Sequence, residues 1–215
     1  MKHEGPIVTV DPLIVGLHAG EVYAYFIVRD REPYNGKYTL PGVYVRRNET
    51  VEQAVRRAVA DKTPLVADTA VVLAPFKVYD NVGRDPRGHA LSLACLVVVE
   101  PTSVDMQDLG WVKLSDCSGQ QDSLFGFDHL DIASSGRKEL GSQTWIAPEV
   151  LSSLLGKATA TGQELFALQK QLGGSWDRAN FNKHLSNIPW LVEVGQIAVG
   201  DRGRGRPSKS WRIVV

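Results

Sequence analysis

The stretch from Leu40 to Leu65, LPGVYVRRNETVEQAVRRAVADKTPL, carries basic side chains in its loop, Arg46 and Arg47. Arg29 and Arg31 lie in a polar loop shortly before it. A planar guanidinium group can pair with a pyrophosphate through parallel hydrogen bonds. These arginines therefore indicate a site for a phosphate-bearing ligand, although a solvated surface position is the commoner fate of an arginine.

A second loop with the same chemistry is the segment from Asp80 to Gly88, DNVGRDPRG. Its Arg84 and Arg87 can approach the phosphate or the ribose of a nucleotide. They can equally cap their own loop through Asp85, and the sequence leaves both interpretations open.

A short helix is expected to follow the first loop. Thr50 and Gln53 have the spacing of a capping box. An apolar stripe at helical spacing follows, formed by Val51, Ala54, Val55, Ala58 and Val59. Pro64 predicts an end near Lys62, because the residue before a proline avoids the helical conformation.

Loop and helix together resemble the Nudix box, the signature of nucleoside diphosphate hydrolases. The entry Leu40–Gly42 has the usual form, with Val43 where the signature has glycine, and the residues that fall in register with the signature are Glu49, Arg57, Val59 and Leu65. The resemblance implies a pocket lined by Arg46 and Glu49. With the arginines above, the candidate ligand-binding residues are Arg29, Arg46, Glu49, Arg57, Arg84 and Arg87.

The three carboxylates in the second half of the signature are not conserved in this box. Ala58, Asp61 and Lys62 stand in their places, and Pro64 replaces the following glycine. Mg²⁺ requires oxygen ligands in near-octahedral geometry, and the lysine adds a positive charge beside the cation position. We therefore expect no metal ligand and no catalytic residue in the box, and a protein that is not an enzyme.

Composition places the chain among globular proteins, with 43% hydrophobic and 22% charged residues in 215. No apolar run approaches the roughly 20 residues that span a bilayer, and MKHEGPIVTV has no signal-peptide core. The two cysteines, Cys95 and Cys117, are far apart. These features favour a cytoplasmic protein without membrane partners.

The net charge of zero hides an asymmetry. Residues 157–215 hold nine Lys/Arg and four Asp/Glu, so this end carries an excess of positive charge. A basic C-terminal third on an acidic body suggests a polyanionic partner.

The pattern of residues in this basic C-terminal end predicts a winged helix. A helix opened by the capping box Thr161–Glu164 and a second helix over 176–187, capped by Ser175, flank the Gly173–Gly174 turn. Strands are expected over 191–194 and 210–214, with a basic hairpin tip between them for which a disordered tail is the alternative. The candidate DNA-binding residues are Arg178, Asn180, Asn182, Lys183, Arg202, Arg204, Arg206 and Lys209.

This combination resembles the Nudix-related transcriptional regulators of bacterial NAD metabolism, the NrtR type. The motifs are LPG followed by Tyr-Val-Arg, then RDPRG, then RGRP. The resemblance implies an α+β fold with a Nudix-like α/β/α sandwich (1–142) built on a mixed sheet, and a winged helix-turn-helix (143–215). It also implies a homodimeric repressor of NAD-synthesis genes that binds an inverted-repeat operator in double-stranded DNA. The effector would be ADP-ribose or another NAD-derived nucleotide, with sugars in some relatives, and no cofactor is required.

Two other functions remain open from the sequence. The chain can be a residually active Nudix hydrolase of ADP-ribose-type substrates, whose C-terminal part only dimerises. It can also be a regulator that binds RNA instead of duplex DNA.

Overall fold

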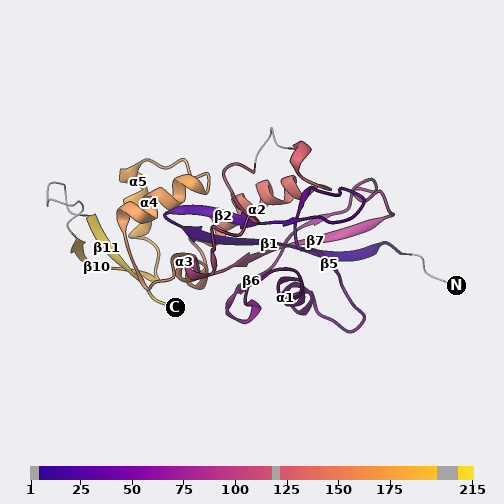
Figure 1. The fold of residues 1–215 in the computed structure, drawn as a ribbon. Helices are drawn as coiled ribbons and strands as arrows, with labels where there is room; N and C mark the ends of the chain where they lie inside the picture. The colour runs from indigo at the N-terminus through magenta and orange to yellow at the C-terminus, as the bar shows by residue number, and fades with distance from the viewer. Residues whose placement is uncertain (1–4, 118–121, 198–207) are drawn as a thin grey trace.

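A mixed six-stranded sheet lies at the centre of the N-terminal part of the computed structural model, which describes residues 5–117, 122–197 and 208–215 (Figure 1). Its strands follow the order β6-β7-β1-β2-β8. Strand β5 pairs with the N-terminal half of β1, on the edge that β2 leaves open. The strands are β1 (Ile7–His18), β2 (Glu21–Tyr25), β5 (Val43–Tyr44), β6 (Val71–Tyr79), β7 (Ala90–Val98) and β8 (Trp111–Lys113). Only β1 and β7 run parallel, which makes the sheet mixed as expected.

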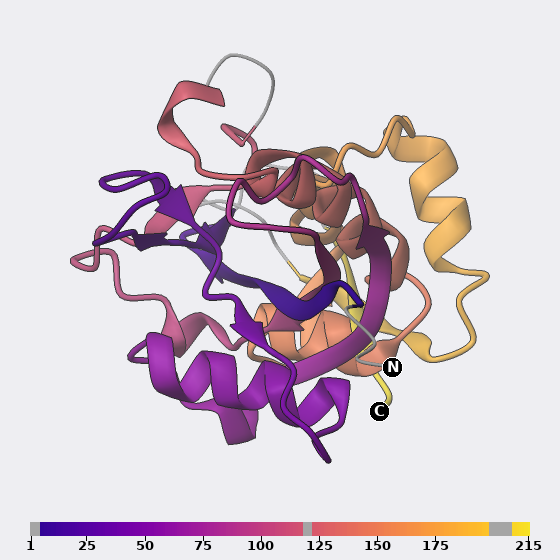
Figure 2. The same ribbon diagram turned by 90° about the vertical axis from the view of Figure 1, so that its right-hand side faces the viewer.

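Alternation along β1 assigns its side chains to two cores. Val10 and Ile14 point to the face covered by α1 (Val51–Lys62), whereas Leu13 and Val15 point to the face covered by α2 (His129–Gln143). The helices lie on opposite sides of the sheet (Figures 1 and 2). The expected α/β/α sandwich is therefore confirmed.

Two strands have unusual features. Strand β1 continues through Pro12, because this residue falls between the segments of β1 that pair with β5 and with β2. A residue without an N–H is tolerated there. The extended stretch 21–28 breaks at Phe26 into β2 and β3 (Ile27–Val28), and β3 pairs separately with β4 (Tyr38–Thr39).

The described residues of the C-terminal part form three helices and a three-stranded sheet. The helices are α3 (Pro148–Leu155), α4 (Gly162–Gln171) and α5 (Arg178–Leu185), and the sheet has the order β10-β11-β9. Its strands are β9 (Thr159–Thr161), β10 (Leu191–Ile197) and β11 (Ser208–Ile213). Short 3₁₀ helices also lie in the N-terminal part, namely η1 (Ala67–Thr69), η2 (Pro101–Ser103) and η3 (Asp122–Leu124).

Helix caps account for the ends of these elements. Thr50 and Thr161 each form the expected capping box. The cap predicted at Ser175 is wrong, because Asp177 accepts the backbone N–H of Asn180 and starts α5 two residues later. An ionised carboxylate is a strong acceptor at a helix N-terminus.

The two parts share one hydrophobic cluster that reaches from Leu13 in β1 to Phe181 in α5 and Trp211 in β11. Helix α3 contacts β1, β6 and β7 of the central sheet and also β11 of the C-terminal sheet. The predicted boundary at 142/143 falls in the last turn of α2 and stays a prediction. Across the described ranges, no helix combines the length and apolar character that a bilayer crossing demands.

Candidate functional site

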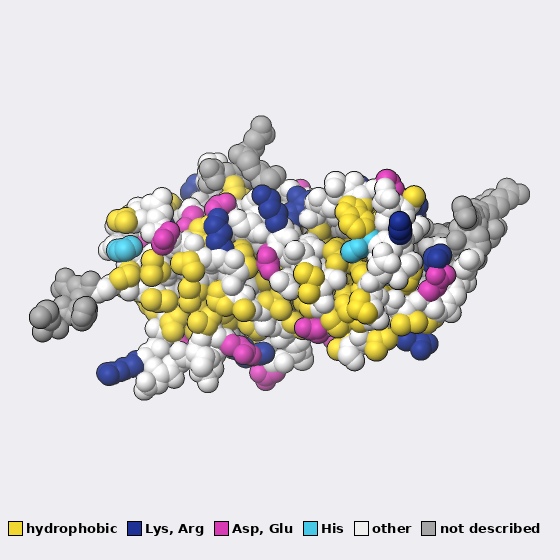
Figure 3. All heavy atoms as spheres, turned by 180° about the vertical axis from the view of Figure 1, so that it is seen from behind, with side chains coloured by type: hydrophobic (Ala, Val, Ile, Leu, Met, Phe, Trp, Pro, Cys, Tyr) yellow, Lys and Arg dark blue, Asp and Glu magenta, His cyan; other side chains and the backbone are white. Residues whose placement is uncertain are grey.

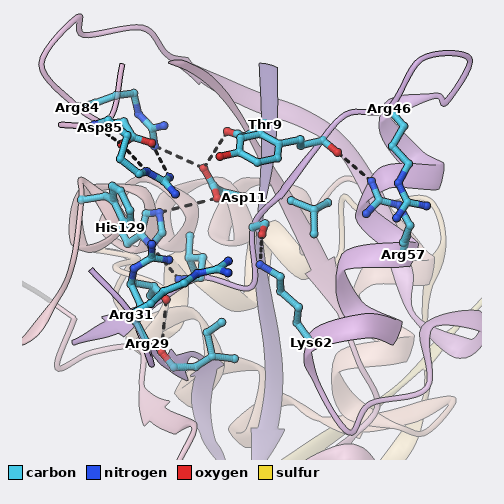
Figure 4. Close-up of a pocket in the computed structure, with 18 residues that line it drawn as sticks. Thr9, Asp11, Arg29, Arg31, Arg46, Arg57, Lys62, Arg84, Asp85 and His129 are labelled. Carbon is cyan, nitrogen blue, oxygen red and sulfur yellow. Dashed lines mark hydrogen bonds and ion pairs between the residues drawn. The ribbon is translucent and has the colours of Figure 1, made fainter. Parts of the chain in front are cut away.

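A cavity of about 400 Å³ opens beside β1 and the N-terminal end of α2 (Figure 4). Its walls carry more positive than negative side chains. The cationic residues are Arg29, Arg31, Arg46, Arg57, Lys62, Arg84 and Arg87, and the acidic residues are Asp11 and Asp85. An excess of fixed positive charge in a concave site attracts an anion.

Asp11 anchors one wall of the cavity from the middle of β1. Its Oδ2 accepts a hydrogen bond from Ser92 Oγ at 2.5 Å and a longer one from Arg84 Nη2 at 3.4 Å. A Cβ added to Gly42 would lie 1.9 Å from Asp11 Oδ1, so the loop can pass the carboxylate only with a glycine there. The buried aspartate and the glycine of LPG therefore shape the cavity together.

Arg84 is held between two carboxylates. Its Nε and Nη2 donate to Asp128 at 2.8 and 2.6 Å, and its side chain is only 4% exposed. Burial lowers the pKa of the guanidinium, but the hydrogen bonds to Asp128 and the charge of Asp11 outweigh this and raise the pKa. Arg84 thus joins the RDPRG loop to the N-cap residue of α2 and stays charged.

His129 closes the same wall as a neutral ring. Burial lowers its pKa more than the charge of Asp11 raises it. Its Nδ1 accepts the backbone N–H of Leu40 at 2.8 Å, so the ring proton lies on Nε2, 3.8 Å from Asp11 Oδ1. The histidine therefore fixes the start of the LPG loop.

Arg57 reaches the cavity from α1, and Glu49 stands beside it as its partner. The two form a bidentate pair at 2.7 and 2.8 Å, and Glu49 also accepts the backbone N–H of Arg46 at 2.8 Å. These hydrogen bonds, the one from Arg57 first, lower the pKa of Glu49 to about 2. Among the described residues that line the cavity, Glu49 is absent, so its side chain positions Arg57 and the loop.

The remaining predicted arginines stand on the opposite side of the cavity. Arg87 forms a bidentate pair with Asp85 at 2.9 and 2.6 Å. It therefore caps its own loop, which is one of the two interpretations that the sequence left open. Arg29 donates from Nε to the carbonyl oxygen of Pro33 at 2.5 Å. The guanidinium groups of Arg29 and Arg87 both lie over the ring of Phe127, at 5.3 and 5.6 Å from its centroid.

The box positions do not fit a metal ion. Ala58 is fully buried without an oxygen, Asp61 is exposed outside the cavity lining, and Lys62 extends into the cavity and donates to the carbonyl oxygen of Gly42. Over residues 5–117, 122–197 and 208–215, no cluster of three or more His, Cys, Asp or Glu is arranged to hold a metal.

Arg31, which the sequence marked as a phosphate-binding arginine beside Arg29, lines the cavity. Sequence reasoning did not select Lys62 as a ligand contact, although it stands at a box position. Asp11 and Phe127 carry no local motif, because each reaches the cavity only through the fold.

The predicted DNA-binding residues of α5 lie on an exposed helix. Arg178 and Lys183 are exposed, and the guanidinium of Arg178 lies 4.6 Å from the centroid of Phe166. The amide of Asn180 donates to Asp177 at 2.7 Å, so it supports the helix cap, whereas Asn182 is partly buried.

The wing is described only in its strands. Lys209 pairs with Glu193 across β10 and β11 at 2.7 Å. Arg202, Arg204 and Arg206 lie outside the described residues. The paired strands β10 and β11 confirm that a hairpin follows the helix-turn-helix.

Two characterised proteins resemble the chain. The ADP-ribose pyrophosphatase of Methanocaldococcus jannaschii is 35% identical over 94 residues, which cover 44% of this chain and about half, 52%, of that enzyme. The ADPR responsive transcriptional repressor NtrR of Acinetobacter baylyi is 20% identical over 221 residues, which cover 99% of this chain and 84% of that protein. No family model matches the chain.

Solved structures extend the likeness to the fold of nearly the whole chain. NrtR of Shewanella oneidensis, complexed with a 27mer DNA, superposes with a TM-score of 0.70 at 21% identity, covering 96% of this chain and 93% of that one. The NUDIX domain of the same protein, complexed with ADP ribose, gives 0.53 at 23% identity, covering 64% and 90%. From β1 to β11, the chain therefore shares the fold of the NrtR protein of Shewanella oneidensis.

Proposed function

We propose that the chain is a DNA-binding transcriptional repressor whose N-terminal domain binds ADP-ribose or a related NAD-derived nucleotide. The observation that carries this proposal is that one chain combines the cationic cavity with a helix-turn-helix and two wing strands. A nucleoside diphosphate offers the two phosphates that such a cavity attracts. The repressor of Acinetobacter baylyi and the DNA complex of the Shewanella oneidensis protein support the same function.

Within this proposal, Arg29 and Arg46 contact the ligand directly, while Arg57, Arg84 and Arg87 do so from the positions that their carboxylates fix. Exposed Arg178 and Lys183, together with Asn182 and Lys209, face the DNA. Asn180 acts through the cap of α5. The effector site needs no cofactor, and the repressor works in the cytoplasm on genes of NAD synthesis or salvage.

Two copies of the chain are proposed to bind an inverted repeat, since one winged helix contacts too few base pairs for useful specificity. An apolar band crosses the face seen from behind (Figure 3). The edge strand β6 also exposes apolar side chains, including Val78 at 51%. A second copy would cover such a surface.

The test is fluorescence anisotropy of the full chain on duplex DNA from upstream of its own gene, with and without ADP-ribose. We expect tight, saturable binding that ADP-ribose weakens by about 5- to 150-fold, the range of a coupling free energy of roughly 1–3 kcal/mol. Binding that is equal for unrelated duplexes, or stronger for single-stranded RNA, would contradict an operator-specific repressor.

A residual hydrolase is the second candidate, favoured by the likeness to the ADP-ribose pyrophosphatase. The replacement of the box carboxylates by Ala58, Asp61 and Lys62 opposes it. Release of AMP from ADP-ribose in Mg²⁺ decides between them. Turnover near one per second would place the chain among ordinary enzymes, which run at about 1 to 10³ s⁻¹.

A further inference from the structure

One of the residues at the carboxylate positions of the box enters the cavity. Of the three residues that replace the box carboxylates, only Lys62 lines the cavity, whereas Ala58 is buried and Asp61 is exposed. Lys62 is the last residue of α1, and its side chain extends into the cavity (Figure 4).

The ammonium group of Lys62 retains capacity for a ligand. Its Nζ donates to the carbonyl oxygen of Gly42, and an ammonium has three N–H donors. Within the described residues, Nζ of Lys62 donates to this one carbonyl oxygen, so its other two N–H donors can reach a ligand in the cavity.

Charges around Lys62 are mostly of its own sign. Arg31, Arg29 and Arg57 act on it from the cavity walls, and Asp11 is the carboxylate that opposes them. Burial is the largest cause of the lowered pKa of Lys62, followed by the charge of Arg31. A bound anion relieves this repulsion, whereas a divalent cation adds to it.

We propose that the Lys62 ammonium replaces the metal ion of a Nudix site and binds the diphosphate of the ligand directly, together with Arg29 and Arg31. A lysine ammonium is a compact point charge with several donors, which suits a bridging position between phosphate oxygens. Ligand recognition is then independent of divalent cations. This inference deepens the proposed function and rests on it for the identity of the nucleotide, but not for the diphosphate chemistry.

The test is isothermal titration of the full chain with inorganic pyrophosphate and with ADP-ribose, first in EDTA and then in excess Mg²⁺. Wild-type protein should bind both probes in EDTA, and Mg²⁺ should not strengthen binding. Lys62→Met keeps the length of the stem without the charge. It should weaken binding of both probes about tenfold or more in EDTA, the effect of losing one charge-assisted hydrogen bond.

Two further variants control for charge and folding. Lys62→Arg keeps the charge and should bind more tightly than Lys62→Met. Lys113→Met removes a partly exposed lysine on β8 that pairs with Glu21, outside the cavity, and should bind like wild type. Thermal unfolding of each variant establishes that the fold is retained.

The outcomes separate the two proposals. Wild-type binding only in Mg²⁺, or equal affinity of folded Lys62→Met and wild type in EDTA, overturns the role of Lys62. Pyrophosphate binding that depends on Lys62, without any binding of ADP-ribose, supports the role of Lys62 and contradicts ADP-ribose as the effector.

Discussion

The side chain of Gln171 at the end of α4 accepts the backbone N–H of Val22 in β2, with 2.8 Å between Oε1 and N. Its Nε2 donates to the carbonyl oxygen of Gly20 in the β1–β2 turn. The backbone carbonyl oxygen of Gln171 accepts a hydrogen bond from Nε of Arg137, a residue of α2, at 2.6 Å. One residue of the helix-turn-helix therefore contacts both β2 and α2.

Both contacted elements lead back to the cavity. The β1–β2 turn joins β2 to β1, which carries Asp11 in the cavity wall. Helix α2 begins at His129, which lines the same cavity. A ligand shifts the DNA-binding part only if it binds two arrangements of this connection with unequal affinity.

Replacing Gln171 with Leu should reduce the coupling between effector and DNA. The substitution removes both side-chain hydrogen bonds and leaves the N–H of Val22 unpaired, at a cost of about 1–3 kcal/mol in stability. The ratio of operator affinities measured without and with ADP-ribose should fall toward one. Gln163→Leu, at an exposed position of the same helix, is the matched control. An unchanged ratio in folded Gln171→Leu would place the coupling elsewhere.

Arg84 and Arg87 belong to one loop but should differ in their effect on stability. Arg84→Met leaves Asp128 and buried Asp11 without their shared partner, and breaking a buried ion pair costs about 3–5 kcal/mol. Arg87→Met breaks a pair whose arginine is 42% exposed, and exposed pairs contribute about 0–1 kcal/mol. Urea denaturation of both variants measures the difference. Equal losses of unfolding free energy in the two variants would mean that the buried ion pairs of Arg84 stabilise the fold no more than the exposed pair of Arg87.

Glu49 should make stability depend on pH in the acid range. Its hydrogen bonds from Arg57 and from the Arg46 N–H lower its pKa from 4.5 to about 2. A carboxyl group with a lowered pKa stabilises the fold above its ordinary pKa and loses this contribution as the pH falls toward the folded value. The loss therefore lies between pH 4.5 and about 2.

The measurement is the free energy of unfolding of wild type and Glu49→Gln across that range. Wild type should lose more stability on acidification than Glu49→Gln, which lacks the titrating group. Glu52→Gln removes an exposed partner of Arg56 on the same helix and should follow wild type. Parallel curves for wild type and Glu49→Gln would contradict the assignment of the pKa shift to this pair.

Local signals explain which features were predictable from the sequence. The capping boxes at Thr50 and Thr161 are each written within four consecutive residues, and both helices start where those residues indicate. The hairpin β10–β11 was likewise predictable from two apolar runs around a glycine-rich turn. Such patterns act through neighbours in the chain, so no knowledge of the fold is required.

Features that arise from distant pairing were not predictable. Asp11 and Ser92 are 81 residues apart, and Arg84 and Asp128 are 44 residues apart, so their hydrogen bonds exist only after the sheet has formed. Strand β9 is three residues long and is a strand because it pairs with β11. No propensity of three residues marks such a strand in advance.

Lys183 should act as a phosphate contact on α5, and its loss should weaken binding to all duplexes alike. It is exposed on the helix, whereas Arg178 lies over Phe166 and Asn180 is held by Asp177. Contacts to phosphate position a protein without reading sequence. Lys183→Ala should therefore lower the affinity for operator and unrelated DNA by similar factors.

The salt dependence of binding gives the decisive measurement for Lys183. Each phosphate contact adds about 0.9 to the slope of log affinity against log salt concentration on duplex DNA, because counterions are released. Lys183→Ala should reduce the slope by about this amount and leave the preference for the operator unchanged. Lys77→Ala, which removes an exposed lysine of β6 paired with Asp131, should leave the slope intact. A normal slope in Lys183→Ala, or a loss confined to the operator, would show that Lys183 does not contact the phosphate backbone.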